Sequence, residues 1–364
     1  MKLLEPDLDE LDLVGGVAEA LRTDALRLVS ATRSDAFNSE LWFLTLDFDE
    51  RYGGRACPAR MVLKRNKDGA GAFEHRFYSL QIESSDGMAF VPTCYFAAES
   101  PETGVSALLL EDLSVTHNGA VERNPNIKGE ATVDRWAWDG ILRTLAQFHG
   151  HWWGSSSIGA PDTPFPVRSW FCNEDAYKAF LSKRRDEFQI FRQQVAGSDY
   201  DPFITVLEET LCLLPRLWKH RISERTESRQ NITLSHGDCF IGQFLVPNDP
   251  GVGHVKLVDF QEASANVPAF DLGYLLSFFP PANQRETLDS LRRYYAFLPP
   301  AITGQYTFDD LLDDYQWVLC LLVFDPVWDE SYQGPSDAYW GPKLRNAMKD
   351  FQKLNCLEFL KRLN

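Results

Sequence analysis

The sequence predicts an α+β protein with two lobes, a small β-rich lobe followed by a larger, mostly helical one. A chain of 364 residues is longer than one ordinary hydrophobic core accommodates, which favours two lobes. Short apolar runs bounded by turn residues, typical of antiparallel strands, lie between residues 41 and 110. Apolar stripes at helical spacing follow from residue 132 onward. The expected domains are an N-lobe at 1–110, a hinge at 111–113 and a C-lobe at 114–364.

Composition and net charge indicate a globular protein and argue against a nucleic-acid-binding function. The chain is 44% hydrophobic and 13% aromatic, which indicates a globular protein with ample material to bury. Its net charge of -16 argues against nucleic acid as a partner, because the phosphate backbone attracts clustered Lys and Arg. Two explanations of the acidity stay open: solubility, and attraction of a cationic small-molecule substrate.

The cysteines and the apolar segments predict a cytoplasmic protein without a membrane partner. Seven cysteines are widely spaced and include no CxxC pair, so they indicate neither a disulfide framework nor a zinc motif. The N-terminal segment is acidic and interrupted by Pro6, unlike a signal peptide. The longest apolar runs, such as Trp317 to Phe324, are far shorter than the roughly 20 residues that cross a bilayer.

The stretch from Leu234 to Tyr274 carries most of the recognisable chemistry. Two short apolar strands, expected at 243–246 and 255–258, flank the segment NDPGVG, which has the composition of a hairpin turn. Such a hairpin puts Asp238 at its entry and Asp259 at its exit. Paired strand ends can bring two carboxylates close enough to share a divalent cation and a phosphate. The pattern therefore predicts phosphoryl transfer.

The two carboxylates suit different roles in that reaction, which depends on positioning and charge neutralisation. Asp238 suits acceptance of a proton from an attacking hydroxyl, and Asp259 suits binding of Mg²⁺, a hard cation that prefers oxygen ligands. Either motif alone is also typical of a capped turn or of the end of a buried strand. Their order, with a hairpin between them and DLGYLL after them, favours the functional interpretation.

The same stretch resembles the aminoglycoside phosphotransferase and choline kinase group of small-molecule kinases, including its ecdysteroid kinase-like branch. The matching residues are His236, Gly237, Asp238, Asp259 and Phe260. The resemblance implies a bilobal protein-kinase-like fold that transfers the γ-phosphate of ATP, with Mg²⁺, to a hydroxyl of a small molecule. It implies Asp238 as the catalytic base and Asp259 as the main metal ligand. A protein kinase is a weaker alternative, because HGD replaces the pattern in which Arg follows His.

One metal-binding position departs from the family pattern. The resemblance leads us to expect Asn five positions after Asp238, where this chain has Gln243. Mg²⁺ demands near-ideal octahedral geometry at about 2.0–2.1 Å, and an extra methylene moves the amide oxygen. Gln243 is therefore a second metal ligand only if the loop adjusts or a water intervenes. Otherwise the site is weakened, and the alternative function is that of a pseudokinase, a nucleotide- or partner-binding module.

Residues for nucleotide binding are predicted in the N-lobe. A helix is expected at 13–30, before the strands, and another at 69–83. Lys64 ends a strand, and the resemblance assigns it to the ATP phosphates. Glu74, on the second helix, is expected to form the ion pair that positions this lysine.

The loop that covers the phosphates is expected at 34–40, just before the strand that starts at residue 41. It lacks a glycine-rich signature, so Ser34, Asn38 and Ser39 are its candidate phosphate-binding groups. The hinge follows the strand expected at 105–110, and the resemblance implies that its backbone meets the adenine. Its candidate residues are Glu111 and Leu113.

In the C-lobe, the helix that starts near residue 132 carries a wide apolar stripe, which is expected to be core. His149 and His151 are interpreted as packing histidines. Asp271 is expected to accept backbone N–H groups at a helix start, and the resemblance gives it a role in supporting the catalytic loop. Acidic and aromatic residues alternate from Phe308 to Trp340. They form either an acceptor pocket for an amine or a solvated acidic helix face over an aromatic core.

Overall fold

The computed structural model describes residues 2–4, 10–22, 26–35, 39–48, 59–67, 69, 71–84, 88–328 and 337–363. The chain divides into two compact units. Unit 1 comprises Met1–Asn118 and Leu245–Glu262, and unit 2 comprises Gly119–Phe244 and Ala263–Asn364. Residues 245–262 thus group with the N-terminal unit, whereas the sequence-based division kept 114–364 continuous.

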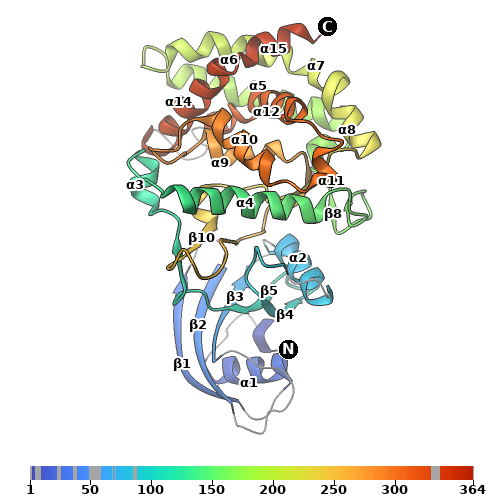
Figure 1. Ribbon diagram of the computed structural model, residues 1–364. Helices are drawn as coiled ribbons and strands as arrows, with labels where there is room; N and C mark the ends of the chain where they lie inside the picture. Colours follow the sequence, from blue (N-terminus) through green and yellow to red (C-terminus); the bar gives the residue numbers. More distant parts are fainter. Residues whose placement is uncertain are drawn as a thin grey trace. The chain divides into compact units, whose positions relative to one another are not determined.

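Unit 1 is built on a five-stranded antiparallel sheet with the strand order β1-β2-β3-β5-β4 (Figure 1). Its strands are β1 (Leu26–Asp35), β2 (Ser39–Phe48), β3 (Arg60–Asn66), β4 (Cys94–Glu99) and β5 (Ser106–Glu111). Unit 2 is mostly helical. The predicted α+β class, with a strand-rich part before a helical part, is therefore confirmed.

Helices cover both faces of this sheet. Because side chains alternate along a strand, Met61 and Leu63 of β3 share one face and are fully buried in the core with α1 (Glu10–Leu21). Lys64 points to the opposite face, where it meets α2 (Ala72–Glu83). The sheet thereby separates an apolar core on one side from a charged site on the other.

The helix predicted at 13–30 is wrong in its second half. Helix α1 ends at Leu21, Arg22 adopts a left-handed φ of 55°, and the chain re-enters as β1 at Leu26. A register shift between Leu28 and Ser30 interrupts the alternation of β1, which explains why no strand pattern is visible there. The loop expected at 34–40 is shorter than predicted, because β1 extends to Asp35 and β2 begins at Ser39.

The predicted hairpin is present, with its first strand shifted by one residue and its second strand shorter than expected. β10 (Phe244–Pro247) pairs with β11 (Lys256–Leu257) and with β6 (His117–Gly119) in a small sheet of order β11-β10-β6. Pairing within this sheet holds Asp259 just beyond the second strand.

Unit 2 contains a two-stranded antiparallel ladder, β9 (Thr233–Ser235) with β12 (Ser264–Asn266), among helices. The long helix α4 (Arg135–Trp152) packs against α10 (Thr287–Phe297) and β9, and α9 (Ala269–Ser277) packs against α12 (Phe308–Leu322). The stripe predicted as core on α4 is buried, as expected. The other helices are α3 (Arg123–Ile127), α5 (Glu174–Gln194), α6 (Asp201–Leu213), α7 (Pro215–Leu217), α8 (Ser223–Ser228), α11 (Pro300–Thr303), α14 (Asp337–Lys353) and α15 (Cys356–Arg362).

Among the described residues, none of the helices combines the length and the apolar character that crossing a membrane requires.

Candidate functional site

Lys64 of unit 1 lies between two carboxylates. Its Nζ is 2.9 Å from the carboxylate of Glu74 and 2.6 Å from Oδ1 of Asp259, so the expected Lys64–Glu74 ion pair is present. Burial lowers the pKa of Lys64, but the charges and hydrogen bonds of Glu74 and Asp259 outweigh it, and the net pKa is raised. The lysine therefore stays protonated and offers a fixed positive charge.

A hydrogen-bond chain continues from Glu74. Its side chain is 1% exposed and accepts a hydrogen bond of 2.8 Å from Asn66 Nδ2. Asn66 Oδ1 in turn accepts a bond of 2.8 Å from Gln261 Nε2. This chain ties the segment after Asp259 to the end of β3. Sequence reasoning missed Asn66 and Gln261, because carboxamides at these positions carry no motif.

Asp259 has an unusual backbone and a packed neighbour. Its φ is 73°, in the left-handed region that non-glycine residues rarely adopt, and its side chain is 37% exposed. The next residue, Phe260, is fully buried and stacks on Phe77 of α2, with Tyr78 edge-on at 6.0 Å. The backbone strain is thus held in place by aromatic packing on one side of the residue.

Two of the three candidate phosphate-loop residues belong to the facing ends of β1 and β2. Ser34 lies near the end of β1 and is exposed, and Ser39 begins β2 and is 4% exposed. Asn38 lies outside the described residues. Ser34 is therefore better placed than Ser39 to reach a ligand with its side chain.

The candidate hinge residues already use part of their backbone. Glu111 ends β5, and its N–H donates to the carbonyl of Thr93 at 2.8 Å. Leu113 is 5% exposed, and its carbonyl accepts from the N–H of His117 at 2.8 Å. If this segment binds adenine, it would do so through backbone groups other than the N–H of Glu111 and the carbonyl of Leu113.

In unit 2, the carboxylate of Asp271 holds the segment that follows β9. It accepts four hydrogen bonds, from Ser235 Oγ (2.8 Å), His236 N (2.7 Å), Gly237 N (2.9 Å) and His149 Nε2 (3.0 Å). Burial raises the pKa of Asp271, but the hydrogen bond and charge of His149, with His236 and the Gly237 N–H, outweigh it and lower the pKa. Asp271 thus supports the loop rather than capping its own helix, which has no side-chain cap.

His149 is fully buried and hydrogen-bonded, as a packing histidine is expected to be. Its Nδ1 lies 2.7 Å from the hydroxyl of Tyr294, and its carbonyl accepts from Thr233 Oγ1 at 2.7 Å. Because its Nε2 binds Asp271, however, its packing role also fixes the loop. The sequence offered no link between these residues, which lie more than 100 positions apart.

Asp238 is partly exposed at the end of that loop. Its N–H donates to Nδ1 of the fully buried His236 at 3.4 Å, so this histidine helps to orient the loop. Gln243 is 7% exposed, and its Nε2 lies 3.5 Å from Oδ2 of Asp238. The amide of Gln243 thus directs a donor toward the candidate base.

Arg168 also contacts this loop, and sequence reasoning missed it. Its Nη2 donates to the carbonyl of Gly237 at 3.0 Å, and its Nε donates to Ser264 Oγ at 3.2 Å. Its guanidinium lies 4.8 Å from the ring centre of Phe270. No local pattern marks Arg168, which lies in a proline-punctuated segment and contacts a main-chain atom.

Four of the described acidic residues of the cluster between Phe308 and Trp340 have structural partners, while Asp309 is exposed in the first turn of α12. Asp310 completes the capping box of α12 with Thr307. The other pairs are Asp313 with Arg221, the fully buried Asp314 with Arg225, and Asp325 with Lys343. Asp329, Glu330 and Tyr332 lie outside the described residues. These pairs favour the interpretation of the cluster as structural.

The candidate metal ligands fit one kind of site. Among the described residues, no group of three His, Cys, Asp or Glu side chains could hold a metal ion by itself. Mg²⁺, however, usually keeps several waters and binds through one or two carboxylates together with substrate phosphates. The carboxylate of Asp259, which is partly exposed, suits such a site.

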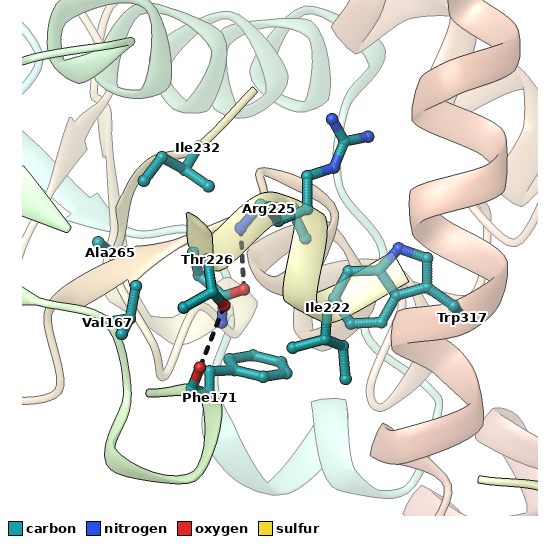
Figure 2. A pocket seen from close by; sticks show the side chains of 10 residues that line it. Val167, Phe171, Ile222, Arg225, Thr226, Ile232, Ala265 and Trp317 are labelled. Carbon is teal, nitrogen blue, oxygen red and sulfur yellow. Dashed lines mark hydrogen bonds between the residues drawn. The ribbon is translucent and has the colours of Figure 1, made fainter. Parts of the chain in front are cut away.

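A small cavity of about 20 Å³ lies in unit 2 beside β12 (Figure 2). Its lining is mainly apolar, with Phe171, Ile222 and Trp317. Asn266 also lines it, with a buried Nδ2 that has no hydrogen-bond partner among the residues that the structure describes. Because a water needs about 10–15 Å³ of such volume, the cavity suits one structural water and is too small for a substrate.

Comparisons with known proteins bear on the family and the fold of the chain. The ecdysteroid kinase-like family profile matches residues 73–297. The GDP complex of an aminoglycoside 2'-phosphotransferase-IIIa variant is 16% identical with a TM-score of 0.51, over 98% of this chain and 97% of that chain. A ternary complex of an aminoglycoside phosphotransferase with ADP and hygromycin B is 14% identical with a TM-score of 0.50, over 96% and 98%.

A choline/ethanolamine kinase family protein from Mesorhizobium loti is 14% identical with a TM-score of 0.47, over 91% of this chain and 92% of that chain. No curated protein matches the chain. At these identities the two phosphotransferase structures show the fold alone, and they confirm the predicted kinase-like fold.

Proposed function

Because the chain belongs to the ecdysteroid kinase-like family, we propose that it transfers the γ-phosphate of ATP to a hydroxyl group of a small molecule. The observation that carries this proposal is the placement of Lys64 between Glu74 and Asp259. A buried lysine held by a helix carboxylate is the arrangement by which kinases position a charge for ATP phosphates.

Unit 1 supplies the nucleotide-binding groups in this proposal. Lys64 neutralises phosphate charge, and Glu74 fixes its direction. Asp259 would hold Mg²⁺, which when bound neutralises the charge that develops on the transferred phosphate. Gln243, which belongs to unit 2, stays a predicted second ligand. The two phosphotransferase structures described above contain GDP or ADP, which supports a nucleoside triphosphate as the donor here.

Unit 2 supplies the groups that act on the acceptor. Asp238 is partly exposed on a loop whose backbone is fixed by Asp271 and His236. It would accept the proton of the attacking hydroxyl or orient that hydroxyl toward the phosphate. The acceptor is thus any small molecule that presents a hydroxyl to Asp238, such as an aminoglycoside, a choline-like alcohol or a sterol.

Calorimetric titration with ATP, with and without Mg²⁺, tests this function. We expect Mg²⁺ to tighten ATP binding in the wild-type protein and in Asp249→Ala, and not in Asp259→Ala. Asp249 is a matched control because it is an exposed carboxylate in the turn of the same hairpin. An ATP affinity that changes neither with Mg²⁺ nor in Asp259→Ala would contradict the proposal, as would the absence of ATP binding. Either result would favour a partner-binding module.

A further inference from the structure

We propose that Arg168 is a positioning residue for the transfer reaction, because it fixes the peptide plane from which Asp238 projects. The inference rests on the proposed role of Asp238. Arg168 lies far from the HGD motif in sequence, and the family motif does not include it.

The backbone around Arg168 is itself anchored beside the loop. Val167 lies beside Ala265 of β12 in Figure 2 and forms a parallel bridge with it. β12 pairs with β9, which leads directly into the loop. The side chain of Arg168 therefore starts from a fixed point. Its Nε donates to Ser264 Oγ, and its guanidinium lies against the face of Phe270. These two contacts leave Nη2 directed at the carbonyl of Gly237.

Gly237 is the position where this loop most needs an external restraint. Its φ is 86°, a conformation that suits glycine, and glycine has the widest range of backbone conformations. Its N–H donates to Asp271 at 2.9 Å, and its carbonyl accepts from Arg168 at 3.0 Å. The negative Asp271 thus holds the N–H of Gly237, and the positive Arg168 holds its carbonyl. Glycine is the residue whose own backbone resists rotation least.

The carbonyl of Gly237 belongs to the same peptide plane as the N–H of Asp238. Arg168 binds one side of that plane, and His236 Nδ1 accepts from the other side at 3.4 Å. Rotation of the plane would break both contacts and swing the Cα–Cβ bond of Asp238. The hydrogen bond to His236 is long and therefore the weaker restraint. The charge-assisted hydrogen bond from Arg168 thus contributes more to fixing this peptide plane.

The guanidinium and the carboxylate of Asp238 also face a common neighbour. Burial raises the pKa of Tyr274, and among the nearby charges Arg168 opposes this effect while Asp238 adds to it. The positive charge of Arg168 therefore lies in the same environment as the candidate base. The planar guanidinium of Arg168 donates from two nitrogens, one to Ser264 and one to Gly237. A lysine ammonium could not bind both groups in the same geometry.

The test compares Arg168→Ala and Arg168→Lys with Arg184→Ala. Arg184 is a matched control, since it also stacks on a phenylalanine and donates one hydrogen bond, to Glu187, without touching the loop. We expect Arg168→Ala to lower kcat about 100-fold, the effect of roughly 1 Å of misplacement, with little change in the KM for ATP. Added guanidinium should restore part of the rate of Arg168→Ala, and Arg168→Lys should stay impaired.

Hydrogen exchange provides a readout that does not need activity. Amides of residues 236–240 should exchange faster in Arg168→Ala than in the wild type or Arg184→Ala. Unchanged exchange together with an unchanged kcat would overturn the positioning role, while an intact effect of Asp238→Asn would leave the proposed function standing. If the wild type transfers no phosphate, the proposed function fails, and the exchange comparison alone then decides whether Arg168 holds the loop.

Discussion

Phe260 lies flat against Phe77, with ring centroids 3.8 Å apart and an interplanar angle of 11°. Both rings are fully buried. Phe77 belongs to the helix that carries Glu74, and Phe260 follows Asp259 directly. One apolar contact therefore sets the spacing of the two carboxylates that flank Lys64.

A double-mutant cycle on this contact should reveal coupling. Phe77→Ala and Phe260→Ala should each lower the free energy of unfolding by about 3–5 kcal/mol, because each leaves a cavity. The double variant should lose about 0.5–1.5 kcal/mol less than the sum, the share of the ring–ring interaction. Chemical denaturation measures all three. Leu44→Ala, on the other face of the sheet, should add to Phe260→Ala without coupling, and equal behaviour of both pairs would contradict a direct contact.

Removal of the Lys64 charge should harm both stability and nucleotide binding. Lys64→Met leaves Glu74 buried at 1% exposure with an uncompensated charge, which costs about 3–5 kcal/mol of unfolding free energy. The control is Lys67→Met, whose lysine is 50% exposed and pairs with Glu40, so its loss costs less than about 1 kcal/mol. Thermal unfolding and ATP titration of both variants check this. Wild-type ATP affinity in Lys64→Met would remove Lys64 from the phosphate site.

Asp238→Asn should separate catalysis from binding. We expect kcat to fall by about 10²–10⁴-fold, the usual contribution of a general base, while ATP affinity stays at the wild-type value. Coupled assays of ADP release measure the rate, and titration measures affinity. Asp249→Asn serves as the control, and an unaffected rate in Asp238→Asn would exclude Asp238 from the chemistry.

Asp271 should make stability depend on pH in the acid range. Its pKa is lower in the folded than in the unfolded chain, so it stabilises the fold fully above the unfolded value of about 3.9. The stabilisation is lost as pH falls through the folded value. Asp271→Asn should therefore lower the free energy of unfolding by about 3 kcal/mol at neutral pH and by progressively less below about pH 4.

Denaturation curves between acid and neutral pH test this difference. Asp289→Asn is the control, because Asp289 is a 60% exposed carboxylate that pairs with Arg293 on the surface. Its cost should stay below about 0.5 kcal/mol at every pH. A difference between the wild type and Asp271→Asn that does not shrink in acid would show that the charge of Asp271 contributes nothing.

Gln243→Asn should strengthen metal binding. The shorter side chain restores the amide that the family pattern has at this position, and it withdraws the donor that now faces Asp238. We expect a lower Mg²⁺ concentration to reach half-maximal ATP binding. Gln261→Asn, a change of the same size outside the predicted metal ligands, is the comparison. Identical Mg²⁺ dependence in wild type and Gln243→Asn would indicate that residue 243 is not a ligand.

Much of the fold could be predicted from the sequence, because the periodicity of apolar residues is a local signal of secondary structure. Strands β2 to β5 fall on the apolar runs between residues 41 and 110, with β2 beginning two residues earlier, and the apolar stripe of α4 follows the same signal. The error at 26–30 arose where that signal fails, because a register shift breaks the alternation of β1. The end of α1 could not be predicted either. Its left-handed position is occupied by Arg22, whereas a glycine there would have indicated a helix end.

The site was only partly accessible for a different reason. Lys64, Glu74 and Asp238 belong to patterns in which residue type and spacing carry the chemistry. Arg168 acts on a main-chain carbonyl, and His149 acts on Asp271 from a helix more than 100 positions away. Neither contact constrains its local sequence, so only the folded arrangement reveals it.

The left-handed backbone of Asp259 limits how this position can change during evolution. Glycine and asparagine adopt such a φ most readily, and both would remove the negative charge. Glutamate would keep the charge, but its longer side chain neither fits this backbone as well nor places its oxygens where Lys64 now meets Asp259. Every substitution that the fold accepts easily here therefore abolishes the carboxylate. A lineage released from the need for that charge would lose it at this residue with little damage to folding.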